Sequence, residues 1–151
     1  MSAEENKTIA RRVREEFIST GDMDLADELL AEDFVYYGPG MLPEVRGREP
    51  FKQTIAAFRA AFPDLTERID EQFTDGDRVI SRFTTRGTFT GELMGIPPTG
   101  KAFTTTNGMD ICRIADGRVV EVWAMFDALA MLQQIGAIPT AGPTPEIVGE
   151  G

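Results

Sequence analysis

The chain has 151 residues, with 42% hydrophobic and 26% charged side chains, which are the proportions of a soluble globular protein of one domain. Its formal charge of −10, with 15 Lys and Arg residues scattered among acids, argues against a nucleic-acid partner. The chain contains no histidine, which excludes Ser-His-Asp and Cys-His nucleophilic sites. Any catalysis must therefore use carboxylates, Tyr, Lys or Arg.

Two features bear on the cellular compartment. No run approaches the roughly 18 apolar residues of a membrane span, and the first residues lack the apolar segment of a secretory signal. Cys112 is the only cysteine, so the chain cannot form an intramolecular disulfide or a Cys-based zinc cluster. We expect a cytoplasmic protein without membrane association or a metal site, in which Cys112 is a core residue.

The first half of the chain carries helical patterns. Residues 5–20 place Ile9, Val13 and Phe17 four apart between charged residues, as in an amphipathic helix, and Gly21 provides the stop. Three further elements are predicted in this half, in chain order a short helix over 22–30, a strand over 33–37 and a helix over 50–62.

The second half has the composition of a β-sheet. Residues 66–91 and 101–127 are rich in Thr, Val, Ile and Phe, and each contains an Asp-Gly hairpin signal. Four antiparallel strands are predicted, followed by a last helix over 128–135. Between the second and third strands, residues 91–100 are rich in Gly and Pro, so we expect a loop at the mouth of a pocket. The tail, residues 139–151, is predicted to be irregular and partly mobile.

Helices followed by an antiparallel meander indicate an α+β fold, with the helices packed on one face of the sheet. The predicted strands are long, and long twisted strands curl, with Gly108 as the expected place of a bulge. A curved sheet wrapped around the N-terminal helices forms a cone, whose open end is a natural cavity. We expect one such domain over residues 1–138.

The stretch EVWAMFD, residues 121–127, ends an apolar strand in a carboxylate. Side chains alternate along a strand, so Trp123, Met125 and Asp127 share one face and the even-numbered residues share the other. Both faces are apolar, so one must line the cavity and the other needs cover, which favours a homodimer through the outer sheet face. With the Trp123 face inward, Asp127 lies at the rim of an apolar cavity and can serve as a proton acceptor or donor. Asp is also a favoured N-cap before a helix, so both roles stay open.

Each of the other polar side chains on the strands has two possible roles. Arg82, if it points into the cavity, can polarise a carbonyl, although a solvated strand face is the commoner position for Arg. Asp110 interrupts the third long strand, either as a buried acid or as the cross-strand partner of an Arg. Tyr36 and Tyr37 alternate, so one faces inward, where a phenol donates to an anionic oxygen or packs with a satisfied hydroxyl.

Four segments carry a resemblance to a known family: EDFVYYGPG, REPFKQTIAAFRAAFPDL, GDRVISRFTTRGTFTGELMGIPPTGK and GMDICRIADGRVVEVWAMFDALAMLQQIG. Together they resemble the SnoaL-like polyketide cyclases, often labelled ester cyclases, within the nuclear transport factor 2-like superfamily. The resemblance covers residues 8–136, nearly the whole predicted domain. It implies the same α+β cone that the order of elements predicts.

The resemblance also implies a reaction. In these cyclases an Asp four residues after the last-strand Trp is the general acid/base that closes a polyketide ring by intramolecular aldol condensation, without metal or cofactor. Here this spacing gives Asp127. Arg82 corresponds to an Arg that would hold the enolate oxygen, and Tyr37 stands where relatives often carry a pocket His. The side chains expected to bind a small hydrophobic substrate are Trp123, Met125, Phe89, Met109, Asp110 and Phe58.

The chain departs from the family pattern at several positions, so functions other than cyclisation stay open. Phe89 stands where a second His is common among relatives, so we expect a more apolar pocket. The superfamily also contains the limonene epoxide hydrolases, but the acids of their Asp-Arg-Asp set would fall at Met125 and Thr84, so epoxide hydrolysis ranks below cyclisation. A noncatalytic protein that holds an apolar ligand in the cone, with Asp127 only capping the last helix, is the alternative from another class.

Overall fold

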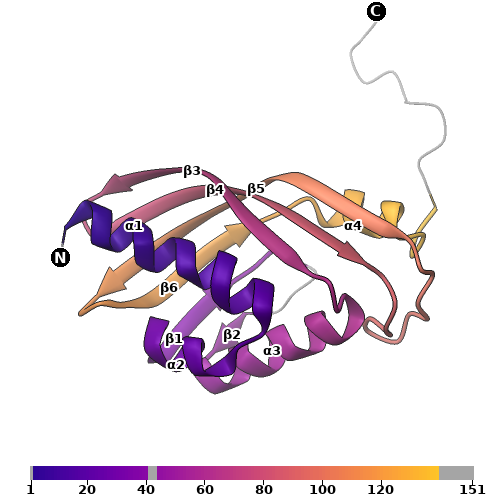
Figure 1. The fold of residues 1–151 in the computed structure, drawn as a ribbon, viewed down its shortest axis with the longest axis horizontal. Helices are drawn as coiled ribbons and strands as arrows, with labels where there is room; N and C mark the ends of the chain where they lie inside the picture. The colour runs from indigo at the N-terminus through magenta and orange to yellow at the C-terminus, as the bar shows by residue number, and fades with distance from the viewer. Residues whose placement is uncertain (1, 41–43, 140–151) are drawn as a thin grey trace, which may run out of the picture.

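The computed structural model describes residues 2–40 and 44–139, and it confirms the predicted α+β fold. The helices are α1 (Ala3–Arg12), its π-helical continuation η1 (Val13–Ile18), α2 (Met23–Leu29), α3 (Arg48–Ala61) and α4 (Ala128–Gln134). The strands are β1 (Leu30–Tyr37), β2 (Val45–Arg46), β3 (Thr66–Asp75), β4 (Arg78–Thr88), β5 (Ala102–Ala115) and β6 (Arg118–Met125). They form one sheet in the order β2-β1-β6-β5-β4-β3, and the sheet curves around α1 and α3 on one of its faces (Figure 1).

The four long strands form the predicted antiparallel meander. β3 pairs with β4, β4 with β5, and β5 with β6. The turn between β5 and β6 places Asp116 and Gly117 at φ values of 51° and 77°, which is the conformation that Asp-Gly favours in a hairpin. β1 instead pairs in parallel with β6, and β2 pairs with β1. Neither β2 nor this parallel pairing was predicted, because β2 is only two residues long and distant segments that pair in parallel share no local turn.

β5 carries the predicted bulge beside Gly108. Phe83 of β4 pairs with Gly108, whereas Thr85 pairs with Thr105, so β5 has one more residue than β4 across this step. A Cβ atom on Gly108 would lie 2.4 Å from Cε2 of Phe83, so only glycine leaves room for that ring. The bulge increases the local twist of the sheet, in keeping with its curvature around the helices.

The predicted first helix is confirmed, but its second half is a π-helix. Gly21, with φ 75°, follows the last turn, and its N–H donates to the carbonyl oxygen of Phe17 at 2.8 Å. Within η1, Arg14 is buried together with Phe17. The Ser19 hydroxyl donates to the Arg14 carbonyl oxygen at 2.8 Å, which satisfies a group at the end of the wider turn. Such π-helical turns are frequent at functional sites.

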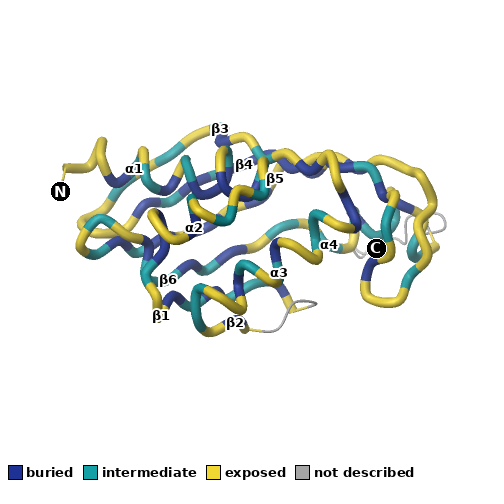
Figure 2. The backbone as a smooth tube through the Cα atoms, turned by 60° about the horizontal axis from the view of Figure 1, so that its bottom comes forward, coloured by how far each residue is buried: buried dark blue, intermediate teal, exposed yellow. Residues whose placement is uncertain are grey.

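Aromatic side chains fill the space between α3 and the concave face of the sheet. Phe51 of α3 makes an edge contact with Phe34 of β1 at 4.9 Å between centroids, and Phe62 makes one with Phe103 of β5 at 5.1 Å. Buried positions concentrate on the strands and on the helix sides that face them (Figure 2). Burial of each large apolar side chain contributes roughly 1.5–3 kcal/mol. Cys112 is free and buried, as predicted.

Two predictions concern the C-terminal tail and membrane association. Of the predicted tail, only Pro139 is described, and residues 140–151 lie outside the described ranges. No helix in the described ranges is long and apolar enough to cross a membrane. The cytoplasmic location stays a prediction.

Candidate functional site

From Val122 on, β6 presents its even-numbered side chains to the helices. Val122 and Ala124 are 4% and 5% exposed, whereas Met125 is 65% exposed. Because side chains alternate, Trp123 lies with Met125 on the outer face. The prediction that the Trp123 face turns inward is therefore wrong. Alternation along an apolar strand cannot choose between its two faces, and here the pairing of β6 between β1 and β5 fixes the choice.

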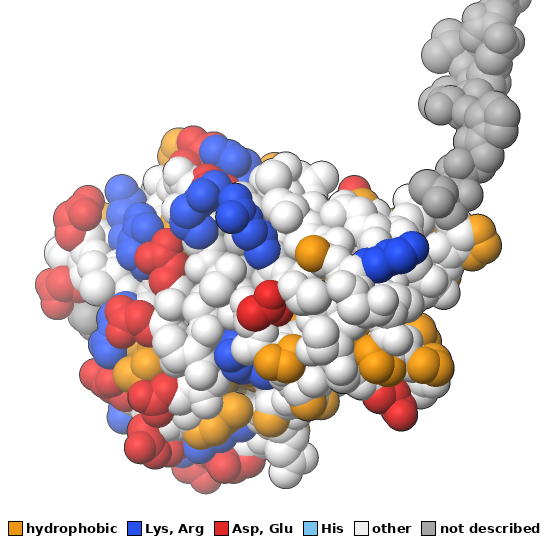
Figure 3. Space-filling model, turned by 45° about the vertical axis from the view of Figure 1, so that its right-hand side comes forward, with side chains coloured by type: hydrophobic (Ala, Val, Ile, Leu, Met, Phe, Trp, Pro, Cys, Tyr) orange, Lys and Arg blue, Asp and Glu red, His pale blue; other side chains and the backbone are white. Residues whose placement is uncertain are grey.

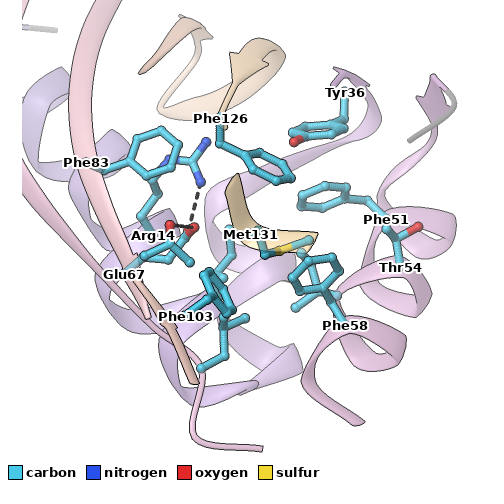
Figure 4. A pocket seen from close by; sticks show the side chains of 14 residues that line it. Arg14, Tyr36, Phe51, Thr54, Phe58, Glu67, Phe83, Phe103, Phe126 and Met131 are labelled. Atoms are coloured by element: carbon cyan, nitrogen blue, oxygen red, sulfur yellow. Dashed lines mark hydrogen bonds and ion pairs between the residues drawn. The ribbon is translucent and has the colours of Figure 1, made fainter. Parts of the chain in front are cut away.

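A hollow opens between α3, the concave face of the sheet and the start of α4 (Figure 4). Its empty volume, counted out to the open solvent at its mouth, is about 630 Å³. Its apolar lining consists of Ile18, Phe51, Ile55, Phe58, Leu65, Phe83, Phe103, Phe126 and Met131. Its polar lining consists of Arg14, Tyr36, Thr54, Glu67 and Thr85. The hollow is thus mostly apolar, with a few polar groups that can orient a ligand.

Three ionisable side chains form a buried cluster at one wall of the hollow. Arg14 of η1 donates through Nη1 to Oε1 of Glu67 on β3 at 2.8 Å and through Nε to Oδ2 of Asp110 on β5 at 2.7 Å. The Arg14, Glu67 and Asp110 side chains are 7%, 8% and 3% exposed. Asp110 is therefore a buried acid, which was one of its two predicted roles, and it is also the partner of an Arg. The Arg comes from a helix, however, and not from a neighbouring strand.

Neighbouring groups hold the cluster in place. The Thr85 hydroxyl donates to Oε2 of Glu67 at 2.9 Å, so each carboxylate oxygen of Glu67 accepts one hydrogen bond within the described residues. The guanidinium carbon of Arg14 lies 3.6 Å from the centroid of the Phe83 ring, a cation–π contact. Since Gly108 leaves room for this ring, the bulge in β5 and the position of Arg14 are linked.

Burial and charge act in opposite directions within the cluster. Burial lowers the pKa of Arg14, but the charges of Glu67 and Asp110 outweigh it and raise that pKa, so the guanidinium stays charged. Burial raises the pKa of Asp110 by more than the charge of Arg14 lowers it. Burial also raises the pKa of the Cys112 thiol. One cation faces two carboxyl groups, so the cluster can take up one proton and become neutral.

Tyr36 faces the hollow, and Tyr37 does not. Tyr36 is 9% exposed, packs against Phe51 at 5.0 Å between centroids, and points its hydroxyl into the hollow (Figure 4). Burial raises the pKa of Tyr36 to about 12, so its hydroxyl stays protonated at neutral pH and can donate. A Cβ atom on Gly38 would lie 2.6 Å from Cε1 of Tyr36, so Gly38 leaves room for the ring. Tyr37 stacks on Trp123 of the outer face at 5.5 Å.

The three side chains predicted to be catalytic do not come together. Asp127 is exposed, and its Oδ1 accepts from the N–H of Ala130 at 2.9 Å as the N-cap of α4. Arg82 lies on the outer face, with its Nε 3.0 Å from Oε1 of Glu71, in the solvated position that the sequence also allowed. Tyr37 lies on the outer face as well. The N-cap role of Asp127 is thus confirmed, and its catalytic role stays a prediction.

The side chains predicted to bind substrate are divided in the same way. Phe58 lines the hollow. Asp110 lies behind Arg14 and does not line it. Phe89 is fully buried against Phe62, with centroids 5.6 Å apart, and is also outside the lining. The remaining three lie on the outer face because the orientation of β6 differs from the predicted one: Trp123, Met125 and Met109.

The loop of residues 91–100 does not form the mouth that the sequence predicted. The N–H groups of Thr90 and Gly91 both donate to the Ala61 carbonyl oxygen at 3.1 Å, so the loop begins against the end of α3. The Thr99 hydroxyl donates to the carbonyl oxygen of Ile135, just after α4. No residue of the loop lines the hollow, because these contacts fasten it to the ends of the two helices.

Sequence reasoning missed Arg14 and Glu67. Neither belongs to a recognisable motif, and both are charged residues among many. The available signal is that Arg14 lies next to Val13 and three residues before Phe17, on the buried side of the predicted helix. A charge at such a position requires a partner. Which carboxyl groups provide it depends on how the helix meets the sheet.

The covering helices, curved sheet and interior hollow define an α+β cone of the nuclear transport factor 2-like class. A SnoaL-like protein from Jannaschia sp. CCS1 has this fold, with a TM-score of 0.81 at 24% identity over 92% of this chain and 98% of that one. IdmH from Streptomyces antibioticus is similar with a TM-score of 0.75 and 34% identity, over 88% of this chain and 99% of that one.

The sequence places the chain within this class. The model of the SnoaL-like polyketide cyclase family matches residues 8–135, so the chain belongs to that family. The aklanonic acid methyl ester cyclase DauD of Streptomyces sp. (strain C5) is 29% identical over 142 residues, which is 91% of this chain and 84% of the relative. The resemblance identified from sequence motifs is thereby confirmed.

Proposed function

We propose that the protein closes a ring in a small hydrophobic, carbonyl-bearing substrate of the polyketide type, by general acid/base catalysis and without a metal or cofactor. The observation that carries the proposal is a mostly apolar hollow with an ionisable wall, in a chain of the cyclase family. A carboxyl group beside such a cavity can take a proton from a carbon next to a carbonyl and return it to the new alkoxide. One such group is sufficient for an intramolecular aldol reaction.

The family resemblance assigns this role to Asp127. In the chain, Asp127 directly follows Phe126 and lies one helical turn before Met131, and both of these line the hollow. Asp127 itself is exposed, caps α4 and is not among the residues that line the hollow. Proton transfer by Asp127 would require the side chain to leave the cap and turn toward the mouth.

Ring closure can be tested with two compounds. One is aklanonic acid methyl ester, which the name of the Streptomyces relative provides. An aldol closure keeps every atom, so we expect a product of unchanged mass in liquid chromatography with mass spectrometry. The other is 2-tetralone, a benzo-fused cyclic ketone. Enzymatic enolisation would exchange its α-hydrogens for deuterium in D₂O, which proton NMR measures. Binding of either compound without closure or exchange would contradict the proposal.

A noncatalytic ligand-binding protein of the same fold is the second candidate. It is favoured by the hydrogen bond from the Ala130 N–H to Asp127, which accounts for this carboxylate without chemistry. Asn is as good an N-cap as Asp, so Asp127→Asn should leave the fold and ligand affinity unchanged. Loss of turnover in this variant would assign the acid/base role to Asp127. A binding protein should show no turnover even in the wild type, and Asp127→Asn should leave its fold and ligand affinity unchanged.

We also propose a homodimer through the outer sheet face. An apolar row crosses that face through directly paired residues, in order Phe73, Ile80, Ile111, Trp123 and Tyr37. Phe73 is 59% exposed and Ile111 is 38% exposed, and other exposed hydrophobic side chains occur in patches between charged ones (Figure 3). Apolar rows of this kind are usually covered. Sedimentation equilibrium should show a dimer that Ile111→Glu converts to a monomer, and a monomeric wild type would contradict the proposal.

A further inference from the structure

We propose that Glu67, inside the hollow, is the group that moves the proton, and that Tyr36 and Arg14 hold the negative oxygen that forms. This inference rests on the proposed function and names a different carboxyl group from the one that the family resemblance implies. It assigns a catalytic role to three residues that the structure brings to one wall from β3, β1 and η1.

Glu67 is a proton acceptor with access to the hollow. Its side chain is 8% exposed and forms part of the lining. Each of its carboxylate oxygens accepts one hydrogen bond, from Arg14 and from Thr85, and a carboxylate oxygen has two lone pairs. One accepting direction on each oxygen therefore remains. Asp127, in contrast, is exposed to water, where a carboxylate gains no advantage over the solvent.

Two hydrogen-bond donors meet the same space. Arg14 uses Nε and Nη1 for its carboxylate partners, and within the described ranges Nη2 has no partner. In Figure 4 the guanidinium group of Arg14 lies beside Phe126. The Tyr36 hydroxyl has no hydrogen bond to a described residue, and it points toward the Phe126 side chain, on the side opposite Arg14 in this view (Figure 4). Two donors without partners beside an acceptor form the arrangement that an oxyanion requires.

The reaction step balances without another reagent. The Glu67 carboxylate takes a proton from the carbon next to a substrate carbonyl, and the C–H electron pair moves to the carbonyl oxygen to give an enolate. Tyr36 and Arg14 donate hydrogen bonds to that oxygen. The enolate carbon then attacks a second carbonyl of the same molecule, and the new alkoxide takes the proton back from Glu67.

The rest of the cluster serves this step through position and charge. Asp110 contacts Arg14 from behind and does not line the hollow, so it is a positioning residue. Its charge, added to that of Glu67, exceeds the single positive charge of Arg14, so proton uptake by the cluster removes an uncompensated buried charge. The apolar lining excludes water from the hydrogen bonds to the enolate, which strengthens them.

The test compares Glu67→Gln with Glu71→Gln, an exposed position on the same strand. Exchange of the α-hydrogens of 2-tetralone should fall about 100-fold or more in Glu67→Gln. It should be unchanged in Glu71→Gln, while binding of the ketone is kept in both. Wild-type exchange in Glu67→Gln, with loss in Asp127→Asn, would overturn this inference and leave the proposed function intact. A wild type that binds the ketone without exchange would overturn both.

A second variant keeps the test decisive if Glu67→Gln does not fold. Tyr36→Phe should weaken binding of 2-naphthol, which resembles the enol of 2-tetralone, by about tenfold or more, because one donor to the oxygen is lost. Tyr37→Phe removes the same hydroxyl from the outer face and should leave this affinity unchanged. Fluorescence titration of the naphthol measures both. Equal affinity in wild type and Tyr36→Phe, or a loss in Tyr37→Phe instead, would contradict the assignment.

Discussion

The concave and convex faces of the same sheet both contain ion pairs. The pairs are similar in length but differ in burial, and so in how strongly water screens them. On the concave face, Arg14 lies 2.8 Å from Glu67 and 2.7 Å from Asp110, with side chains at most 8% exposed. On the convex face, Arg82 lies 3.0 Å from Glu71, with side chains 39% and 48% exposed. Water screens the outer pair but not the inner cluster. Distance alone therefore says little about what each pair does for the protein.

The same contrast separates the two tyrosines. Tyr36 is buried and presents a protonated hydroxyl to the hollow, whereas its neighbour Tyr37 stacks on Trp123 outside. Adjacent residues of β1 thus have different roles: Tyr36 is a candidate catalytic donor, and Tyr37 belongs to the apolar row on the outer face. The lesson is that residue type and spacing define pairs of candidates, and the face of the sheet selects between them.

The largest expected loss of stability comes from replacing the buried arginine, and the exposed arginine serves as its control. Arg14→Met removes the cation from two buried carboxyl groups and should lower the free energy of unfolding by about 3–5 kcal/mol. Arg82→Met removes a screened surface pair and should cost about 0–1 kcal/mol. Urea unfolding followed by circular dichroism measures both. Equal losses would mean that water reaches the inner cluster as freely as the outer pair.

A smaller loss of stability is expected from a substitution in the β5 bulge, which supports the buried cluster. A methyl group at Gly108 would push the Phe83 ring, which packs on Arg14, so Gly108→Ala should destabilise the fold by about 1–3 kcal/mol. Among the described residues, no heavy atom lies within 4 Å of such a group at Gly40, so Gly40→Ala should be nearly neutral. Thermal unfolding of the two variants gives the comparison. A neutral Gly108→Ala would show that Phe83 can move without affecting Arg14.

A still smaller loss of stability is expected at Asp127, the N-cap of α4. Asp127→Ala removes the oxygen that accepts the Ala130 N–H and should cost about 1 kcal/mol. Asp127→Asn keeps an oxygen acceptor and should cost a few tenths of that amount. Both values come from chemical denaturation. If the two substitutions cost the same, the carboxylate charge would matter more than the cap.

The pH dependence of stability should differ in sign between the faces. Burial raises the pKa of Asp110 above its ordinary value of 3.8, so its stabilising contribution is full below that value and is lost as pH rises through the folded-state pKa. A hydrogen bond from Thr84 lowers the pKa of Asp70, so its contribution is present above 3.8 and is lost as pH falls through the folded-state pKa.

Asn substitutions isolate these two contributions. Relative to Asp110→Asn, the wild type should lose stability as pH rises from about 4 toward neutral, with Arg14, Glu67 and Cys112 as the groups that face Asp110. Relative to Asp70→Asn, it should lose stability as pH falls below about 4. Denaturation at a series of pH values measures both slopes. Slopes of the same sign would contradict the difference in burial.

The sequence by itself determined the fold class and most of the elements. The amphipathic spacing of residues 5–20, the Asp-Gly turns and the bulge at Gly108 are local signals, and all three are found where they were predicted. The family resemblance rests on contiguous motifs and is also confirmed. Such features are set by neighbours in the chain, so one sequence is enough to read them.

Only the tertiary structure decided which side chains face the hollow. Apolar residues occupy both faces of β6, and the choice of Val122 over Trp123 depends on how β1 and β5 hold the strand. Arg14, Glu67 and Asp110 meet across 53 and 96 residues of chain, without a motif to connect them. Their contact follows from the low dielectric of the interior, where a buried charge must find a partner from whichever element packs against it.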